Sequence, residues 1–94
     1  MNKIKDPYKY LENVNSKDTF FEFLEILFRD KWDEEKKEKE NPPALVSDKG
    51  VNGWCHGDIG SYLDAIHAWG KNNSDTEPSW RNFAKLLYIG KIYE

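Results

Sequence analysis

Three stretches of the chain place apolar residues at the three- and four-residue spacing of an amphipathic helix. They span about 16–40, 58–71 and 77–92. In chain order, the apolar stripes are Phe20, Phe23, Leu24, Leu27 and Phe28; Ile59, Tyr62, Leu63, Ile66 and Trp69; and Trp80, Phe83, Ala84 and Leu87. We therefore expect an all-α fold, a bundle of three main helices that bury these stripes against one another. Leu86 and Ile89 widen the third stripe, which predicts that the last helix lies centrally with partners on two sides.

Helix-capping residues mark where these elements begin and end. Ser16 and Asp58 precede the first two stripes as N-cap residues, and Asp6-Pro7 is typical of the start of a short helix over residues 8–13. Asn41-Pro42-Pro43 ends the first long helix, because proline lacks the amide N–H and restricts the residue before it. Residues 41–57 are then expected to form a long loop, in which 44–46 and 51–54 have the composition of a small hairpin.

The first long helix changes character in its second half. From residue 29 to residue 40 only Trp32 is apolar, and all the other side chains carry charges of mixed sign. This pattern favours a solvated helical extension, with a charged arm that docks a partner as the alternative. Trp32 and Trp54 border these irregular segments, and each either closes the edge of the core or anchors a binding partner.

Composition narrows the class of protein. The 94 residues make one domain, 1–94, with a net charge of −3. An acidic chain is poorly suited to nucleic acid, whose binding requires a basic surface, but it suits a basic protein partner. The single cysteine needs no oxidising compartment, and no apolar run approaches the length of a membrane span or a signal peptide. We expect a cytoplasmic protein that binds neither nucleic acid nor membrane.

One segment places a nucleophile, a base and an acid side by side: Trp54-Cys55-His56-Gly57-Asp58. Catalytic Cys–His pairs usually come from distant parts of a sequence, so adjacency does not favour catalysis here. A structural zinc site needs four ligands, and the chain holds only three Cys or His residues. No phosphate-binding glycine motif is present. We therefore expect no enzyme activity, no metal and no cofactor.

Several motifs resemble a family of small bacterial helical proteins of unknown function. They are Phe20-Phe-Glu-Phe-Leu-Glu-Ile-Leu27, Trp54 ahead of Tyr62-Leu-Asp-Ala65 and Trp69, and Trp80-Arg-Asn-Phe83-Ala84 closing on Ile92-Tyr-Glu94. The resemblance covers most of residues 16–94, and the chain departs from the pattern in a longer charged stretch at 33–53 and a shorter link at 71–77. It implies a compact helical fold and supplies no activity or site residues.

These observations favour a protein that works by binding another protein. The concrete form is an acidic bacterial immunity or antitoxin-type protein that neutralises a basic toxin, since complementary charge speeds association. The predicted partner-binding residues lie in the loop after residue 50 and around the second helix: Trp54, His56, Asp58, Asp64, Asp75 and Glu77. The alternative is a regulatory or scaffold protein that self-associates, with the charged helix at 29–40 as its contact.

Overall fold

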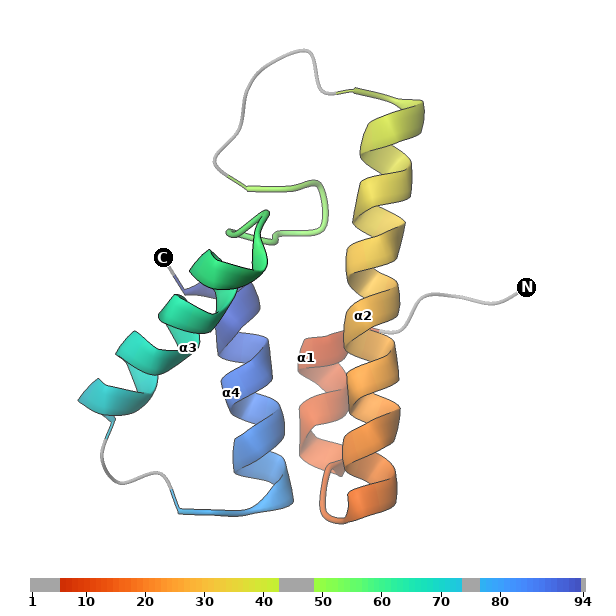
Figure 1. Ribbon diagram of the computed structural model, residues 1–94. Helices are drawn as coiled ribbons and strands as arrows, with labels where there is room; N and C mark the ends of the chain where they lie inside the picture. The colour runs from red at the N-terminus through yellow and green to blue at the C-terminus, as the bar shows by residue number, and fades with distance from the viewer. Residues whose placement is uncertain (1–5, 43–48, 74–76, 94) are drawn as a thin grey trace.

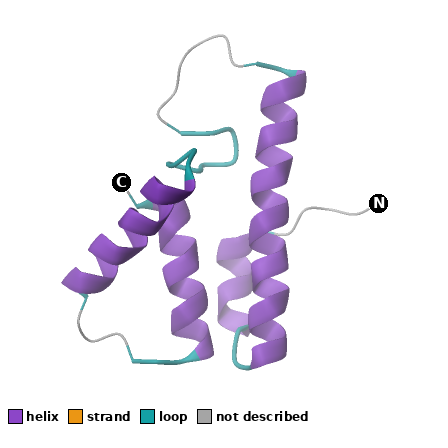
Figure 2. Ribbon diagram, in the orientation of Figure 1, coloured by secondary structure: helices purple, strands orange, loops and turns teal. Residues whose placement is uncertain are grey.

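The computed structural model describes residues 6–42, 49–73 and 77–93. Helices account for most of this part, and no strand occurs within it (Figure 2). The elements are α1 (Pro7–Tyr10), the 3-10 helix η1 (Leu11–Asn13), α2 (Lys17–Glu40), α3 (Ile59–Asn72) and α4 (Trp80–Ile92). The predicted all-α class is confirmed.

The helix starts follow the capping residues. The Ser16 hydroxyl accepts from the Thr19 N–H, and the Thr19 hydroxyl accepts from the Ser16 N–H, which closes a capping box. Asp58 caps α3 by accepting from the Ser61 N–H at 2.7 Å. The last helix begins at Trp80 rather than at 77, because Ser79 is its N-cap and has an extended backbone. Pro78 therefore precedes the helix instead of lying in its first turn.

The last helix lies in the middle of the molecule, as predicted. α4 packs against α3 on one side, against α2 on the other and against η1 (Figure 1). The backbone spans 42 × 34 × 17 Å along its principal axes. α1 packs against α2, and η1 packs against α4, so the two short elements lie on the long helices.

The core lies where α2, α4 and the loop before α3 meet. Its fully or nearly fully buried side chains are Val14, Phe23, Leu27, Trp54 and Ala84. Trp54 is 7% exposed, so it is a core residue, whereas Trp32 is 61% exposed. Close packing of α3 on α4 depends on Gly90: a Cβ there would lie 2.6 Å from a ring carbon of Tyr62. Any larger residue would push the two helices apart.

The prediction of a solvated extension for residues 29–40 is wrong at two positions. α2 runs without interruption to Glu40, but Asp30 and Glu34 are buried, with 7% and 1% of their surface exposed. They are one turn apart, so they share the helix face that points toward the loop. Lys37 pairs with Asp33 at 2.8 Å on the exposed side, which the sequence pattern does anticipate.

Several residues of the predicted stripes are exposed. Ile59 and Leu63 of α3 are 71% and 55% exposed, and Trp80 and Phe83 of α4 also face solvent. The three- and four-residue apolar spacing is present in both helices, but no described element packs against this side of them.

The predicted hairpin is described only in its second half. Residues 44–46 lie outside the described part of the chain, and residues 50–54 form a turn in which the Gly50 N–H donates to the Trp54 carbonyl at 2.9 Å.

Candidate functional site

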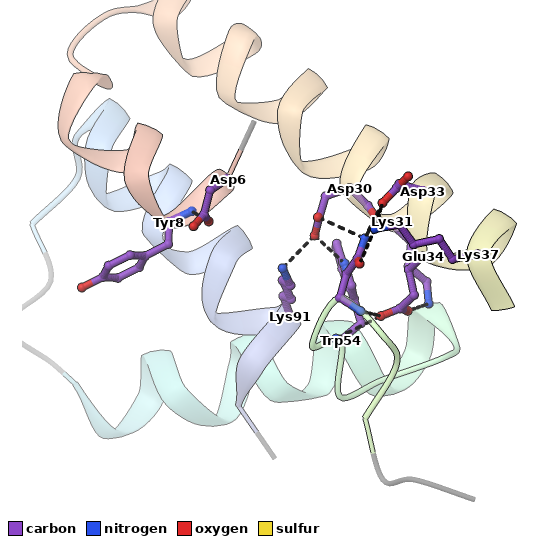
Figure 3. Close-up of polar contacts among 10 residues, drawn as sticks. Asp6, Tyr8, Asp30, Lys31, Asp33, Glu34, Lys37, Trp54 and Lys91 are labelled. Carbon is purple, nitrogen blue, oxygen red and sulfur yellow. Dashed lines mark hydrogen bonds and ion pairs between the residues drawn. The ribbon is translucent and has the colours of Figure 1, made fainter. Parts of the chain in front are cut away.

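A buried polar cluster fixes the loop before α3 against α2 and α4 (Figure 3). Its centre is the Asp30 carboxylate, which accepts from Lys91 Nζ at 2.7 Å and from the Trp54 indole N–H at 2.9 Å. The Asn52 side-chain amide donates to the Asp30 carbonyl oxygen at 2.9 Å and to Asp33 at 3.0 Å. Three segments far apart in the sequence are joined through one carboxylate.

Glu34 completes this cluster one turn further along α2. One of its oxygens accepts from the Asn52 and Trp54 backbone N–H groups, at 3.0 and 3.3 Å, and the other from Lys31 Nζ at 2.9 Å. Lys31 and Lys91 each lie 5.6 Å from the Trp54 ring centroid, within cation–π range. Two buried carboxylates thus meet two ammonium groups, and within the described residues no buried side-chain nitrogen or oxygen lacks a hydrogen-bond partner. The cluster therefore joins the loop to α2 and α4 through fully hydrogen-bonded buried groups.

The next two loop residues satisfy backbone groups at the end of α4. The Cys55 N–H donates to the Lys91 carbonyl at 2.8 Å, and the Cys55 thiol contacts the Ile92 carbonyl at 3.3 Å. His56 Nε2 lies 2.6 Å from the Tyr93 carbonyl and must donate, because a carbonyl oxygen only accepts. The last carbonyl groups of a helix have no N–H partner within the helix, and the backbone and side chains of this loop provide hydrogen-bond partners for them. Cys55 and His56 have a structural role in this arrangement.

With the loop fixed, an apolar groove of about 360 Å³ remains between α2 and α3. α2 forms one wall, α3 the other, Leu87 of α4 lies between them, and the loop closes one end. We call it the α2–α3 groove; its lining residues are Leu24, Leu27, Phe28, Lys31, Trp54, His56, Gly57, Asp58, Ile59, Tyr62 and Leu87. The volume falls within the range of small ligand and side-chain pockets.

Tyr62 joins the α3 wall to α4. Its hydroxyl donates to the Leu87 carbonyl at 2.7 Å, and burial raises the pKa of Tyr62 to about 12. The phenol is therefore neutral at physiological pH and retains its proton for this hydrogen bond. Its ring also lies against Trp54, with centroids 6.0 Å apart. Trp54 and Tyr62 therefore line the groove and also pack in or against the core.

Exposed apolar side chains extend the groove in both directions. On α2, the Trp32 ring contacts the Phe28 ring with a centroid distance of 4.7 Å, and Phe21 lies two turns before Phe28 on the same side. On α3, Leu63 follows Ile59 by one turn; on α4, Phe83 and Trp80 precede Leu87 by one and two turns. We call the exposed large residues among these the open face: Phe21, Phe28, Trp32, Ile59, Leu63, Trp80 and Phe83.

The charged groups at the groove differ in how far they are neutralised. Lys31 is paired with Glu34 at 2.9 Å and lies 4.0 Å from Glu35. Asp58 is exposed and forms no salt bridge within the described residues. Hydrogen bonds from the Ser61 N–H and hydroxyl lower the pKa of Asp58, with a smaller electrostatic contribution from His56, so its carboxylate is ionised at neutral pH. The exposed carboxylate at the groove is therefore Asp58, and His56 is the basic side chain nearest to it in charge interaction.

The structure brings together three of the six predicted binding residues. Trp54, His56 and Asp58 line one groove, although Trp54 contributes mainly as part of the core. Asp64 is exposed on α3 but does not line the groove, and Glu77 is exposed ahead of α4. Asp75 lies outside the described residues. Of the predicted residues, those at the loop and the start of α3 therefore lie together at the groove, and Asp64 and Glu77 do not; that the six residues bind a partner stays a prediction.

Sequence reasoning missed the apolar members of the site. The apolar spacing predicts burial for Phe28, Ile59 and Leu87, but all three line the groove and Ile59 is 71% exposed. One signal in the sequence is the width of the apolar face of α2, because Phe21 lies at the edge of the main stripe, in line with Phe28, and is exposed. An apolar face broader than one neighbour requires can indicate an unfilled contact.

No known protein family, curated protein or solved structure matches this chain. In the part of the chain that the structure describes, no group of three or more His, Cys, Asp or Glu side chains is placed to hold a metal ion. None of the described helices is long and apolar enough to cross a bilayer.

Proposed function

We propose that the protein is a non-enzymatic binding module that receives an apolar segment of another protein in the α2–α3 groove. The observation that carries the proposal is the open face itself. Seven large apolar side chains are exposed; Phe28 and Ile59 line a groove of mainly apolar residues, and helix register places the other five on the same sides of their helices. Proteins that act alone rarely expose contiguous apolar surface of this extent, and large exposed patches mark interaction sites.

The most concrete form of the proposal is an immunity or antitoxin-type protein of a bacterial cytoplasm that neutralises a basic toxin. The net charge of −3 and the ionised Asp58 at the groove support a basic partner. Electrostatic attraction speeds the encounter of such pairs, while apolar contacts at the centre supply most of the affinity. The exposed rings of Phe28 and Trp32 are of the residue class that dominates such interfaces.

The test is a capture experiment with the tagged chain as bait in lysate of its source organism. The decisive comparison is between the wild type and the double variant Phe28→Ser/Ile59→Ser, which removes one side chain from each wall of the groove. Trp54 is unsuitable for this purpose because it is buried and hydrogen-bonded to Asp30, so its loss would test folding. The proposal predicts one protein bound near equal stoichiometry by the wild type and lost with the variant.

A matched control replaces an exposed ring outside the open face. Tyr8→Ser removes an aromatic side chain from α1, where it is 63% exposed, and should capture as well as the wild type. For the immunity form, expression of the captured protein should arrest growth unless the wild-type chain is co-expressed, and Phe28→Ser/Ile59→Ser should fail to protect. Equal capture by the groove variant would place binding elsewhere and contradict the proposal.

A further inference from the structure

We propose that the segment received by the α2–α3 groove is a single amphipathic α-helix with a basic polar face, contributed by a partner protein. This inference rests on the proposed function and specifies its partner. It follows from three properties of the described residues, which are the shape of the groove, the extent of the open face and the sign of the accessible charge.

Shape favours a helix over an extended strand. A bound strand needs an exposed sheet edge with free backbone groups, and the described part of the chain contains no strand. The groove instead has a helix on each side and Leu87 of α4 in its lining, so that mainly side chains face the occupant. A helix laid between α2 and α3 over α4 can cover the groove at interaxial distances of about 8–10 Å.

The extent of the open face fits one helix. Its seven side chains are between 39% and 71% exposed. If each offers about 200 Å² when fully exposed, the accessible apolar area is roughly 700 Å². A standard protein interface buries about 800 Å² on each partner. One helix of about 18 residues, roughly 27 Å long, is of a size to cover the groove and its apolar rim.

Charge selects a basic helix over an acidic one. Lys31 is the ammonium group that lines the groove, and it is already held between Glu34 and Glu35. Asp58 also lines the groove; its carboxylate is exposed and forms no salt bridge with a described lysine or arginine, and its electrostatic neighbour in the lining is His56. A lysine or arginine on the polar face of the bound helix can reach Asp58, whereas an acidic side chain at that place meets a like charge.

Three designed peptides of about 18 residues test the inference. One carries leucine on one helix face and lysine on the other. The second has the same pattern with glutamate in place of lysine. The third has the composition of the first but spreads leucine around the helix. Fluorescence anisotropy of labelled peptides at physiological salt should show the leucine–lysine helix binding at least tenfold more tightly than the other two.

Variants then locate the bound peptide. Phe28→Ser/Ile59→Ser should weaken binding of the leucine–lysine helix at least tenfold. Asp58→Ser keeps an N-cap hydroxyl for α3 and removes the charge, so it should weaken binding by about two- to fivefold, the effect of one partly exposed ion pair. The matched control Asp64→Asn removes the same charge from the same helix, away from the groove, and should leave the affinity unchanged.

Each other outcome overturns the inference, and the capture experiment separates its failure from failure of the proposed function. Equal binding of lysine and glutamate helices would refute the charge preference. Equal binding of the patterned and scrambled lysine peptides, or binding unaffected by Phe28→Ser/Ile59→Ser, would refute the helix in the groove. Absence of peptide binding, while a captured protein still depends on Phe28 and Ile59, would leave the binding module and exclude the basic helix. A peptide-independent dimer mass that Phe28→Ser/Ile59→Ser converts to monomer would make a second copy the occupant.

Discussion

Two regions of α2 and its neighbours reverse the usual relation between polarity and burial. In the polar cluster, Asp30, Glu34 and Lys91 are charged and nearly inaccessible. On the open face, Trp32 and Ile59 are apolar and more than half exposed. The loop that holds Trp54 separates the two regions and contributes to both, since Trp54 donates to Asp30 and lines the groove.

The two regions differ in whether other residues of the chain contact and cover their side chains. Each buried carboxylate meets an ammonium group and further N–H donors at hydrogen-bond distance, and Lys91 donates to Asp30; these contacts offset the cost of desolvation. No described element covers the exposed apolar residues. We infer that the polar cluster stabilises the fold and that the open face binds a partner, so substitutions in the two regions should have different effects on stability.

The largest effect is expected from Lys91→Met. The substitution keeps the length of the side chain and leaves the Asp30 carboxylate buried without its cation. Breaking a buried ion pair from one side costs about 3–5 kcal/mol of unfolding free energy. Urea denaturation followed by circular dichroism measures it. Lys71→Met, at an exposed position near the end of α3, should change stability by less than about 0.5 kcal/mol. Similar values for both variants would mean that the cluster does not stabilise the fold.

A smaller effect is expected from Gly50→Ala. A Cβ at Gly50 would fall on the Glu34 carboxylate, which is buried and cannot swing away without losing its loop partners. Overpacking of this kind costs about 1–3 kcal/mol. Gly57→Ala is the matched control, because a Cβ there meets no atom within 4 Å and its backbone does not have a positive φ. Thermal or urea unfolding of the two variants should differ by that amount, and equal stabilities would argue against the position of the loop on Glu34.

Tyr62→Phe should have a modest effect at neutral pH and a distinct one at high pH. Loss of the hydrogen bond to Leu87 costs about 1 kcal/mol. In the wild type, burial raises the pKa of Tyr62 to about 12, while the unfolded chain ionises near 10. The folded state then holds a proton that the unfolded state releases, so stability is present below pH 10 and is lost as pH rises toward 12. Unfolding measured from pH 8 to 11.5 should show a shallower decline for Tyr62→Phe, and identical slopes would contradict burial of the phenol.

Local signals in the sequence predict the helices well. Ser16 and Asp58 cap helices because their side chains accept from N–H groups three residues ahead, an interaction that depends only on neighbouring residues. The start of α4 was misplaced by three residues, since Ser79 and Pro78 both fit a helix start and only the extended backbone at Ser79 decides between them.

The polar cluster and the open face depend on distant residues, and here sequence reasoning failed. Asp30 looked like one charge among many because its partners Trp54 and Lys91 lie 24 and 61 positions away. Periodicity correctly grouped Ile59 with Leu63 on one face of a helix. It reports which residues share a face, but whether another element covers that face is decided by the packing of the whole chain.

The most direct test of the contrast between the two regions is the unfolding free energy of Ile59→Ser, measured at several protein concentrations. If the open face is a free binding surface, this variant should lose no more than about 1 kcal/mol, because Ile59 is 71% exposed and a side chain that contacts mainly solvent contributes little to folding. The midpoints of wild type and variant should also not depend on concentration. A loss of several kcal/mol, or a wild-type midpoint that rises with concentration, would show that the face is buried in the native protein and would contradict the account.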